Sequence, residues 1–322
     1  MSGWKITLFG KFNVYHDETR LTRFDTRPVQ ELFGYLLLFQ PQPQPRESVI
    51  ETLWGDLSAG KARKKLRQTL WRLQSTLAEQ TNSYGPELLI DNDWIQLVLP
   101  QNFWLDTEEF ENIFNAVNGK RISELSTSDL NKMQYAVEIY KGDLLEGWYA
   151  DWCLFERERF QIMQLTLLDK LAQACELQHQ YDLGLTYAME LLRHDQAYER
   201  AHYLLMRLHA LSGNRTQALH QYARCLTALR EELDVEPSER TKQLYEQIRS
   251  DKLQPPLILE EKVAFQSTAK TSLSTVLKHL EEVSMTLSRL EHQIKEEIVT
   301  FERVPSSRGA ETLWMETQKR RG

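Results

Sequence analysis

Apolar residues switch between two spacings along the first hundred residues. Near the N-terminus they alternate with polar residues, which predicts a small antiparallel sheet from Trp4, Ile6, Leu8, Phe12 and Val14. Helical spacing then predicts three helices. The first begins near Pro28 and ends before Pro41, the second runs from Glu47 to Trp54, and the third runs from Lys61 to Leu77.

Alternation returns after the third helix. Leu88–Ile90 and Trp94–Leu99 flank the turn-forming run Asp91-Asn92-Asp93, which predicts a β-hairpin. A sheet, three helices and a hairpin are the elements of a winged helix, which we expect over residues 1–104. In that architecture the third helix enters the major groove of DNA and the hairpin is the wing.

The third helix separates apolar from cationic residues. Leu66, Leu70, Leu73 and Leu77 form a stripe that must be buried. The opposite face carries no acid, and its residues are Lys61, Lys64, Gln68, Trp71, Arg72 and Ser75, with Lys65 and Arg67 on the flanks. Solvated helices normally mix both signs of charge, so this face indicates a polyanionic partner. A basic exposed helix without a ligand is the alternative.

Residues 105–253 have helical spacing throughout and an internal repeat. Six positions match at a separation of 34 residues, the period of tetratricopeptide repeats. They are Leu171, Cys175, Tyr181, Gly184, Leu185 and Leu192, matched by Leu205, His209, Arg215, Ala218, Leu219 and Leu226. We therefore expect stacked helix pairs, closed by a last helix near residues 240–248.

A second helical pattern follows a predicted linker over residues 254–268. Apolar residues recur at spacings of three and four within residues 269–303, namely at Leu273, Val276, Leu280, Val283, Leu287, Leu290 and Ile294. This pattern predicts a coiled coil that makes the protein a homo-oligomer, a dimer or higher. An amphipathic helix that folds back on the helical repeats is the alternative. Residues 304–322 are predicted to be a disordered tail.

Composition and charge narrow the function classes. The chain has 322 residues and a net charge of −7, yet residues 1–104 hold 12 Lys and Arg against 11 Asp and Glu, and six of these cations lie between Lys61 and Arg72. A local patch would therefore bind a polyanion. No segment has the length of a membrane span and no apolar signal sequence opens the chain, so we expect a cytoplasmic protein without a membrane partner.

Candidate chemistry other than binding is weak. The three cysteines are far apart and the histidines lack ligand spacing, so we expect reduced buried thiols, no metal site and no cofactor. The run from Gly55 to Ala62 nearly spells a P-loop, but Ala62 replaces the hydroxyl residue that binds magnesium. With no catalytic motif present, we expect no enzymatic activity and no catalytic residues.

Several segments resemble one family of regulators. TRPVQELFGYLLL, RESVIETLWGD and ARKKLRQTLWRLQSTL are similar to the winged helix of the Streptomyces antibiotic regulatory protein type. YKGDLLEGWYADWCLFERER and LREELDVEPS resemble the bacterial transcriptional activator domain that follows it in those proteins. The resemblance covers roughly residues 3–252. It implies a cytoplasmic transcriptional activator that binds direct repeats in double-stranded promoter DNA and recruits RNA polymerase.

The resemblance and the basic helix together give the candidate DNA contacts. Arg67 and Gln68 have side chains suited to bidentate contacts with guanine and adenine, while lysines suit phosphate. Trp71 either packs between helices or lies against DNA. A wing tipped by Asp91 and Asp93 repels phosphate, so we expect it to add little affinity. The full candidate set is Arg27, Lys61, Arg63, Lys64, Lys65, Arg67, Gln68, Trp71, Arg72 and Ser75.

Two other functions remain open at this point. The helical repeats could sense a small molecule or peptide, which would make the protein a ligand-gated regulator. Alternatively, the winged helix could bind protein rather than DNA, as part of an interaction scaffold. The acid-free face of the third helix favours the DNA-binding regulator, since a scaffold has no need for it.

Overall fold

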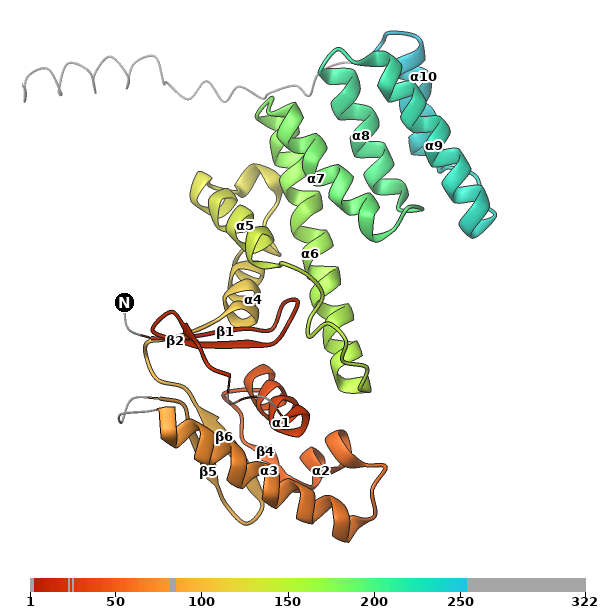
Figure 1. The fold of residues 1–322 in the computed structure, drawn as a ribbon. Coiled ribbons are helices and arrows are strands. Elements are labelled where there is room, and N and C mark those ends of the chain that lie inside the picture. The colour runs from red at the N-terminus through yellow and green to blue at the C-terminus, as the bar shows by residue number, and fades with distance from the viewer. Residues whose placement is uncertain (1–2, 23, 25, 81–84, 254–322) are drawn as a thin grey trace, which may run out of the picture. The chain divides into compact units, whose positions relative to one another are not determined.

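The computed structural model describes residues 3–22, 24, 26–80 and 85–253, drawn as the coloured ribbon in Figure 1. The predicted linker, coiled coil and tail lie outside these residues. Within them, no helix combines the length and the apolar character that crossing a membrane requires.

Two small sheets belong to the N-terminal region. The predicted antiparallel sheet consists of β1 (Trp4–Thr7), β2 (Asn13–His16) and β3 (Thr19–Arg20). It gains a fourth strand, β7 (Phe103–Leu105), which lies parallel to β1. The second sheet has the order β4-β6-β5, from β4 (Gln44–Pro45), β5 (Glu87–Ile90) and β6 (Trp94–Val98). The predicted hairpin is β5 and β6. Strands β4 and β7 were not predicted, because two or three residues are too few to show alternation.

Three helices complete the winged helix. They are α1 (Arg27–Leu38), α2 (Arg46–Trp54) and α3 (Ala59–Gln80), each close to its predicted range. Pro28 lies in the first turn of α1, where the missing backbone N–H is not needed for a helical hydrogen bond. α1 and α3 pack against each other, so α1 supports the buried side of the basic helix.

The remaining described residues are helical. They form α4 (Asp106–Val117), a short 3₁₀ turn (Ile122–Glu124), α5 (Thr127–Ile139), α6 (Asp151–Leu177), α7 (Tyr181–His194), α8 (Glu199–Leu211), α9 (Arg215–Leu233) and α10 (Glu239–Arg249). α10 is the predicted last helix and packs against α8 and α9. The fold class is therefore as predicted, mainly α with an N-terminal α+β winged helix.

The 34-residue repeat is present in the backbone of two helix pairs, α6 with α7 and α8 with α9. The backbone N–H of Gln180 donates to Cys175 O at 2.9 Å, and that of Asn214 donates to His209 O at 2.8 Å. Both turns contain one residue in the left-handed region, His179 (φ 58°) and Gly213 (φ 82°), again 34 positions apart. These are the hydrogen bonds of a helix C-terminus closed by a left-handed residue. The turn between the two helices of a pair is therefore repeated at 34 residues, as are the core positions.

The hydrophobic core does not stop at the predicted boundary between residues 104 and 105. Phe9, which follows β1, contacts the rings of Phe110 and Phe160 at 5.3 Å each and that of Tyr140 at 4.6 Å between centroids. These three partners come from α4, α5's C-terminal cap and α6. The winged helix and the first helices after it therefore share one core, and the domain boundary itself remains a prediction.

Asp106 connects the two regions by hydrogen bonds. Its side chain is buried at the start of α4, and the carboxylate accepts the backbone N–H groups of Leu8 (2.8 Å), Phe9 (2.9 Å) and Thr107 (2.8 Å). Burial raises the pKa of this carboxyl group to about 6, although the N–H donors act in the opposite direction. The carboxylate of Asp106 thus provides the hydrogen-bond acceptor for the backbone N–H groups that directly follow β1.

The segment GDLLEGW adds a second connection. The N–H groups of Leu145 and Glu146 donate to Leu8 O and Gly10 O, both at 2.8 Å. The guanidinium of Arg157 on α6 holds the segment from the other side, donating to the carbonyl oxygens of Leu144 (2.9 Å), Leu145 (2.9 Å) and Trp148 (3.0 Å). The residues that carried the family resemblance therefore form the junction between the winged helix and α6.

Candidate nucleic-acid interface

The buried side of α3 fixes how the helix is presented. Leu66, Leu70, Leu73 and Leu77 are each at most 3% exposed, as the sequence pattern predicted, and Ala62 continues the stripe toward the N-terminus. Five buried residues over four turns prevent rotation of the helix about its axis. The orientation of the opposite face therefore follows directly from the core.

The opposite face carries the predicted residues. Lys61, Arg63, Lys64, Arg67, Gln68 and Arg72 are exposed, and Lys65 and Ser75 are partly buried. Trp71 is 69% exposed, which excludes the alternative in which it packs between helices. An exposed tryptophan among cations and an amide supplies a flat apolar surface next to polar donors, a combination suited to a nucleic-acid groove.

The surface around α3 is not free of acid. Arg63 forms an ion pair with Glu47 of α2 at 3.0 Å, which the sequence analysis missed because the two residues lie on different helices. Both side chains are largely exposed, so the pair contributes at most about 1 kcal/mol. A phosphate could replace Glu47 as the partner of Arg63 at little cost.

Arg27 lies elsewhere. Its guanidinium stacks over the ring of Trp148 at 4.2 Å and its Nε pairs with Glu31 at 2.7 Å. The contact with Trp148 is at the junction with α6 and the pair with Glu31 is within α1, so neither joins Arg27 to the cations of α3. Its role as a DNA contact stays a prediction. The sequence shows which helix Arg27 begins but not the ring on which it stacks.

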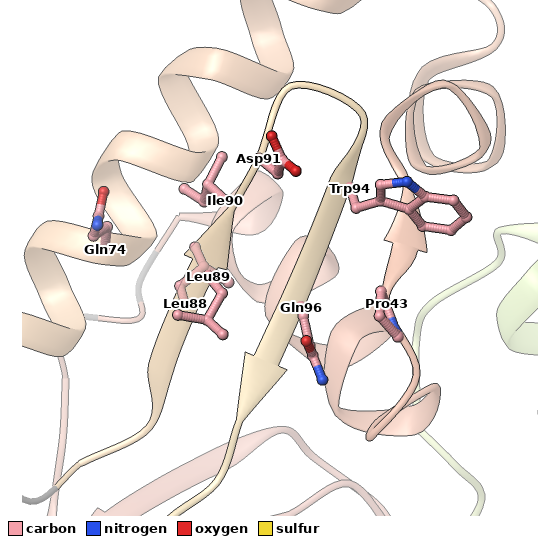
Figure 2. Close-up of a pocket in the computed structure, with 8 residues that line it drawn as sticks. All are labelled: Pro43, Gln74, Leu88, Leu89, Ile90, Asp91, Trp94 and Gln96. Atoms are coloured by element: carbon pink, nitrogen blue, oxygen red, sulfur yellow. The ribbon is translucent and has the colours of Figure 1, made fainter.

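The wing is apolar along its length and acidic at its tip. Figure 2 shows Leu89, Ile90 and Trp94 on the hairpin and Asp91 next to the turn. Trp94 is 48% exposed. Arg46, which the sequence analysis did not single out, donates from Nη1 to Asp91 O at 3.0 Å and from its backbone N–H to Asp93 O at 2.8 Å. These bonds fix the wing turn to the start of α2.

A groove separates the wing turn from the N-terminal half of α3. Its volume is about 740 Å³, and its charged lining residues are Arg46, Arg63 and Arg67 with Glu47 and Asp93. The cations outnumber the acids here by one. The exposed lysines of α3 lie outside this groove, so the strongest positive charge is on α3 and not on the wing.

In the described residues, neither the cysteine thiols nor the side chains that could bind a metal form a reactive cluster. Cys153, Cys175 and Cys225 are buried and unpaired, and burial raises the pKa of the Cys153 and Cys175 thiols to about 11 and of the Cys225 thiol to about 12. Over residues 3–253, gaps excepted, no three His, Cys, Asp or Glu side chains gather as metal ligands would.

Comparisons with known proteins address both halves of the described chain. Residues 105–249 match the model of the bacterial transcriptional activator domain, which confirms the part of the resemblance that concerns those residues. The structure of Mycobacterium tuberculosis EmbR in complex with a low affinity phosphopeptide is similar with a TM-score of 0.65 and 16% identity, over 86% of this chain and 71% of that one. At that identity the likeness shows the fold.

Other matches are weaker. The C-terminal TPR-containing domain of a Plasmodium falciparum FK506-binding protein is 15% identical over 45% of this chain and 87% of that one, with a TM-score of 0.32, too low to support an argument. No curated protein matches the chain.

Proposed function

We propose that this chain, whose residues 105–249 match the bacterial transcriptional activator domain, is a sequence-specific DNA-binding transcriptional regulator of the Streptomyces antibiotic regulatory protein type. The exposed face of α3 carries the proposal. Five exposed cations and one exposed amide share that face with a 69% exposed tryptophan, on a helix whose other side is fixed in the core.

The proposed DNA contacts of α3 fall into two groups, those to base edges and those to phosphates. α3 fits the major groove, which admits one α-helix. Arg67 and Gln68 are adjacent and exposed near the middle of the helix, so they are the candidates for bidentate contacts to base edges. Lys61, Lys64 and Lys65 suit phosphate, and Trp71 offers its ring to a thymine methyl group or a sugar. The acidic wing tip adds little affinity.

Activation and partners follow from the family. A regulator of this type acts in the cytoplasm, binds direct repeats near a promoter and contacts RNA polymerase through its helical domain or the loop from Gly55 to Lys61. The loop supports this role because it is exposed at the start of α3, and Leu57 in it is 40% exposed.

The salt dependence of binding tests the proposal directly. We expect the full chain to bind promoter DNA from upstream of its own gene with an affinity that falls steeply as salt rises. Replacing the three phosphate-facing lysines with glutamine (K61Q/K64Q/K65Q) should make the slope of log K against log salt shallower by about 2 to 3, since each phosphate contact contributes roughly 0.9. Fluorescence anisotropy at four salt concentrations measures both slopes.

The matched control removes the same charge elsewhere. Lys11, Lys132 and Lys252 are exposed lysines outside α3, so K11Q/K132Q/K252Q should leave the slope within about 0.5 of the wild-type value. Equal slopes for all three proteins would exclude α3 as the DNA-binding helix and favour the scaffold.

Oligomerisation is a separate part of the proposal. The seam from Leu273 to Ile294 would place two or more winged helices on one particle, which raises affinity for repeated sites through effective concentration. We expect the full chain to be a dimer or larger and L280D/L287D to be monomeric in light scattering, because two charges in the seam are not tolerated. S288D, next to the seam, should keep the wild-type mass. A monomeric wild type, or no change in L280D/L287D, contradicts the coiled coil.

A further inference from the structure

The helical repeats enclose a groove that the regulator proposed above does not use. It lies between α7, α8 and α9, has a volume of about 650 Å³ and is lined on its apolar side by Met189, Leu192 and Leu205. That volume is within the range of small-molecule sites, which combine an apolar lining with a few polar groups.

Comparison of the two repeat units shows where the polar groups come from. Four positions of the first unit are Leu168, Cys175, Tyr187 and Glu190, and 34 residues later the second unit has His202, His209, Gln221 and Arg224. All four residues of the second unit line the groove. The same backbone packs an apolar residue and a thiol at the first two positions, so helix stacking does not require the imidazoles.

One imidazole is fully satisfied. His202 is 3% exposed, its Nε2 lies 2.9 Å from Gln196 O, and its Nδ1 lies 2.7 Å from Nε2 of Gln221. A carbonyl oxygen accepts from Nε2–H and the amide donates to Nδ1, which holds the ring in one neutral tautomer. His202 and Gln221 therefore form a fixed polar wall.

The other imidazole has an unused nitrogen. Nδ1 of His209 is buried and has no hydrogen-bond partner. Arg224 lies close enough that its charge adds to burial in lowering the pKa of His209, and no ion pair involves Arg224 among the described residues. A buried nitrogen without a partner calls for an explanation, and in the tautomer that carries its proton this nitrogen would donate to an anion beside the exposed guanidinium of Arg224.

We propose that this groove binds a small monocarboxylate with an apolar body, with the carboxylate held by Arg224 and by Nδ1–H of His209. The apolar body lies along Met189, Leu192 and Leu205. Glu231 and Glu232 line the far end, about 10 Å along α9 from Arg224. They exclude a second negative charge and so set the preference for one carboxylate.

Calorimetric titration of the full chain with three matched probes tests the chemistry. Octanoate should bind, octanamide should bind at least about tenfold more weakly because it lacks the charge, and suberate, an eight-carbon dicarboxylate, should also bind more weakly. Equal affinity for octanoate and octanamide, or no binding of octanoate, overturns the proposal. Tighter binding of a free-acid tripeptide such as Ala-Ala-Leu would replace the small acid with a peptide C-terminus.

Two arginines of the same groove provide the matched variants. Arg193 also lines it, but its guanidinium pairs with Glu190 at 2.9 Å. R224Q should weaken octanoate binding at least about tenfold, whereas R193Q should stay within about twofold of the wild type. Equal losses in the two variants overturn the assignment of Arg224. Because the titration contains no DNA and the comparison of R224Q with R193Q assigns the heat to this groove, this proposal can fail while α3 binds DNA.

Discussion

Replacing Asp106 with alanine should lower the free energy of unfolding by roughly 3–5 kcal/mol. The substitution removes the acceptor for the N–H groups of Leu8, Phe9 and Thr107, all in a buried site. Each buried donor left without a partner costs about 1–3 kcal/mol, and water entering the space recovers only part of this. A loss of this size is a large fraction of the stability of an ordinary domain. Urea denaturation of the full chain, followed by tryptophan fluorescence, measures it.

Glu109 on the same helix is the matched control. It lies in the first turn of α4, where its charge interacts favourably with the helix N-terminus, so E109A should cost at most about 1 kcal/mol. If D106A cost no more than E109A, the hydrogen bonds to Leu8 and Phe9 would not stabilise the fold.

The raised pKa of Asp106 predicts the direction in which the free energy of unfolding changes with pH. The folded-state value of about 6 lies above the value near 4 of an unfolded chain, so the folded state takes up a proton as the pH falls through 6. The contribution of Asp106 to the free energy of unfolding therefore rises from pH 7 to pH 5. D106N does not titrate, and the loss that it causes should grow over this range.

Replacing Arg67 and Gln68 with alanine should reduce affinity for the operator by about 100-fold or more. Each bidentate contact to a base edge is worth about 1–3 kcal/mol of discrimination, and both residues are exposed on the outward face of α3. Affinity for unrelated DNA should change much less, because the lysines and Arg72, which we propose contact phosphate, are unchanged. The operator is first selected from random duplexes with the wild-type protein, and the variant is then measured on it and on a scrambled duplex.

Gln74 is the control for the second prediction. It is exposed on α3 but lines the pocket beside the wing (Figure 2), so Q74A should bind the operator within about threefold of the wild type. Retention of full operator preference by R67A/Q68A would show that α3 does not read bases.

The sequence predicted the elements whose signal is local. The leucine stripe of α3, the hairpin turn at Asp91-Asn92-Asp93 and the 34-residue repeat all depend on spacing within one segment, and the structure confirms each. His179 shows the limit of such signals. Histidine is only one of several residue types that adopt the left-handed region more often than most, and its equivalence to Gly213 in the next repeat is the clearer signal.

What the sequence could not show depends on pairs that are distant in the chain. Arg27 was grouped with the cations of α3 because its partner Trp148 belongs to another helical region. The ion pair of Glu47 with Arg63, and the bonds of Arg46 to the wing turn, likewise join separate elements. Asp106 was not singled out because a carboxylate that accepts backbone N–H groups from β1 leaves no local pattern.

The junction at Leu8–Gly10 also decides how such a protein can be engineered. A chimera that exchanges residues 1–104 for the winged helix of another regulator would cut β7 after Trp104, give Leu105 a foreign partner in place of Ile6, and separate Asp106 from its donors. The unit that can be exchanged is larger, and includes α4, the GDLLEGW segment and the first turns of α6 that hold it through Arg157. Modular design of these regulators should therefore place its joint within α6 or beyond it, where repeats contact only their neighbours.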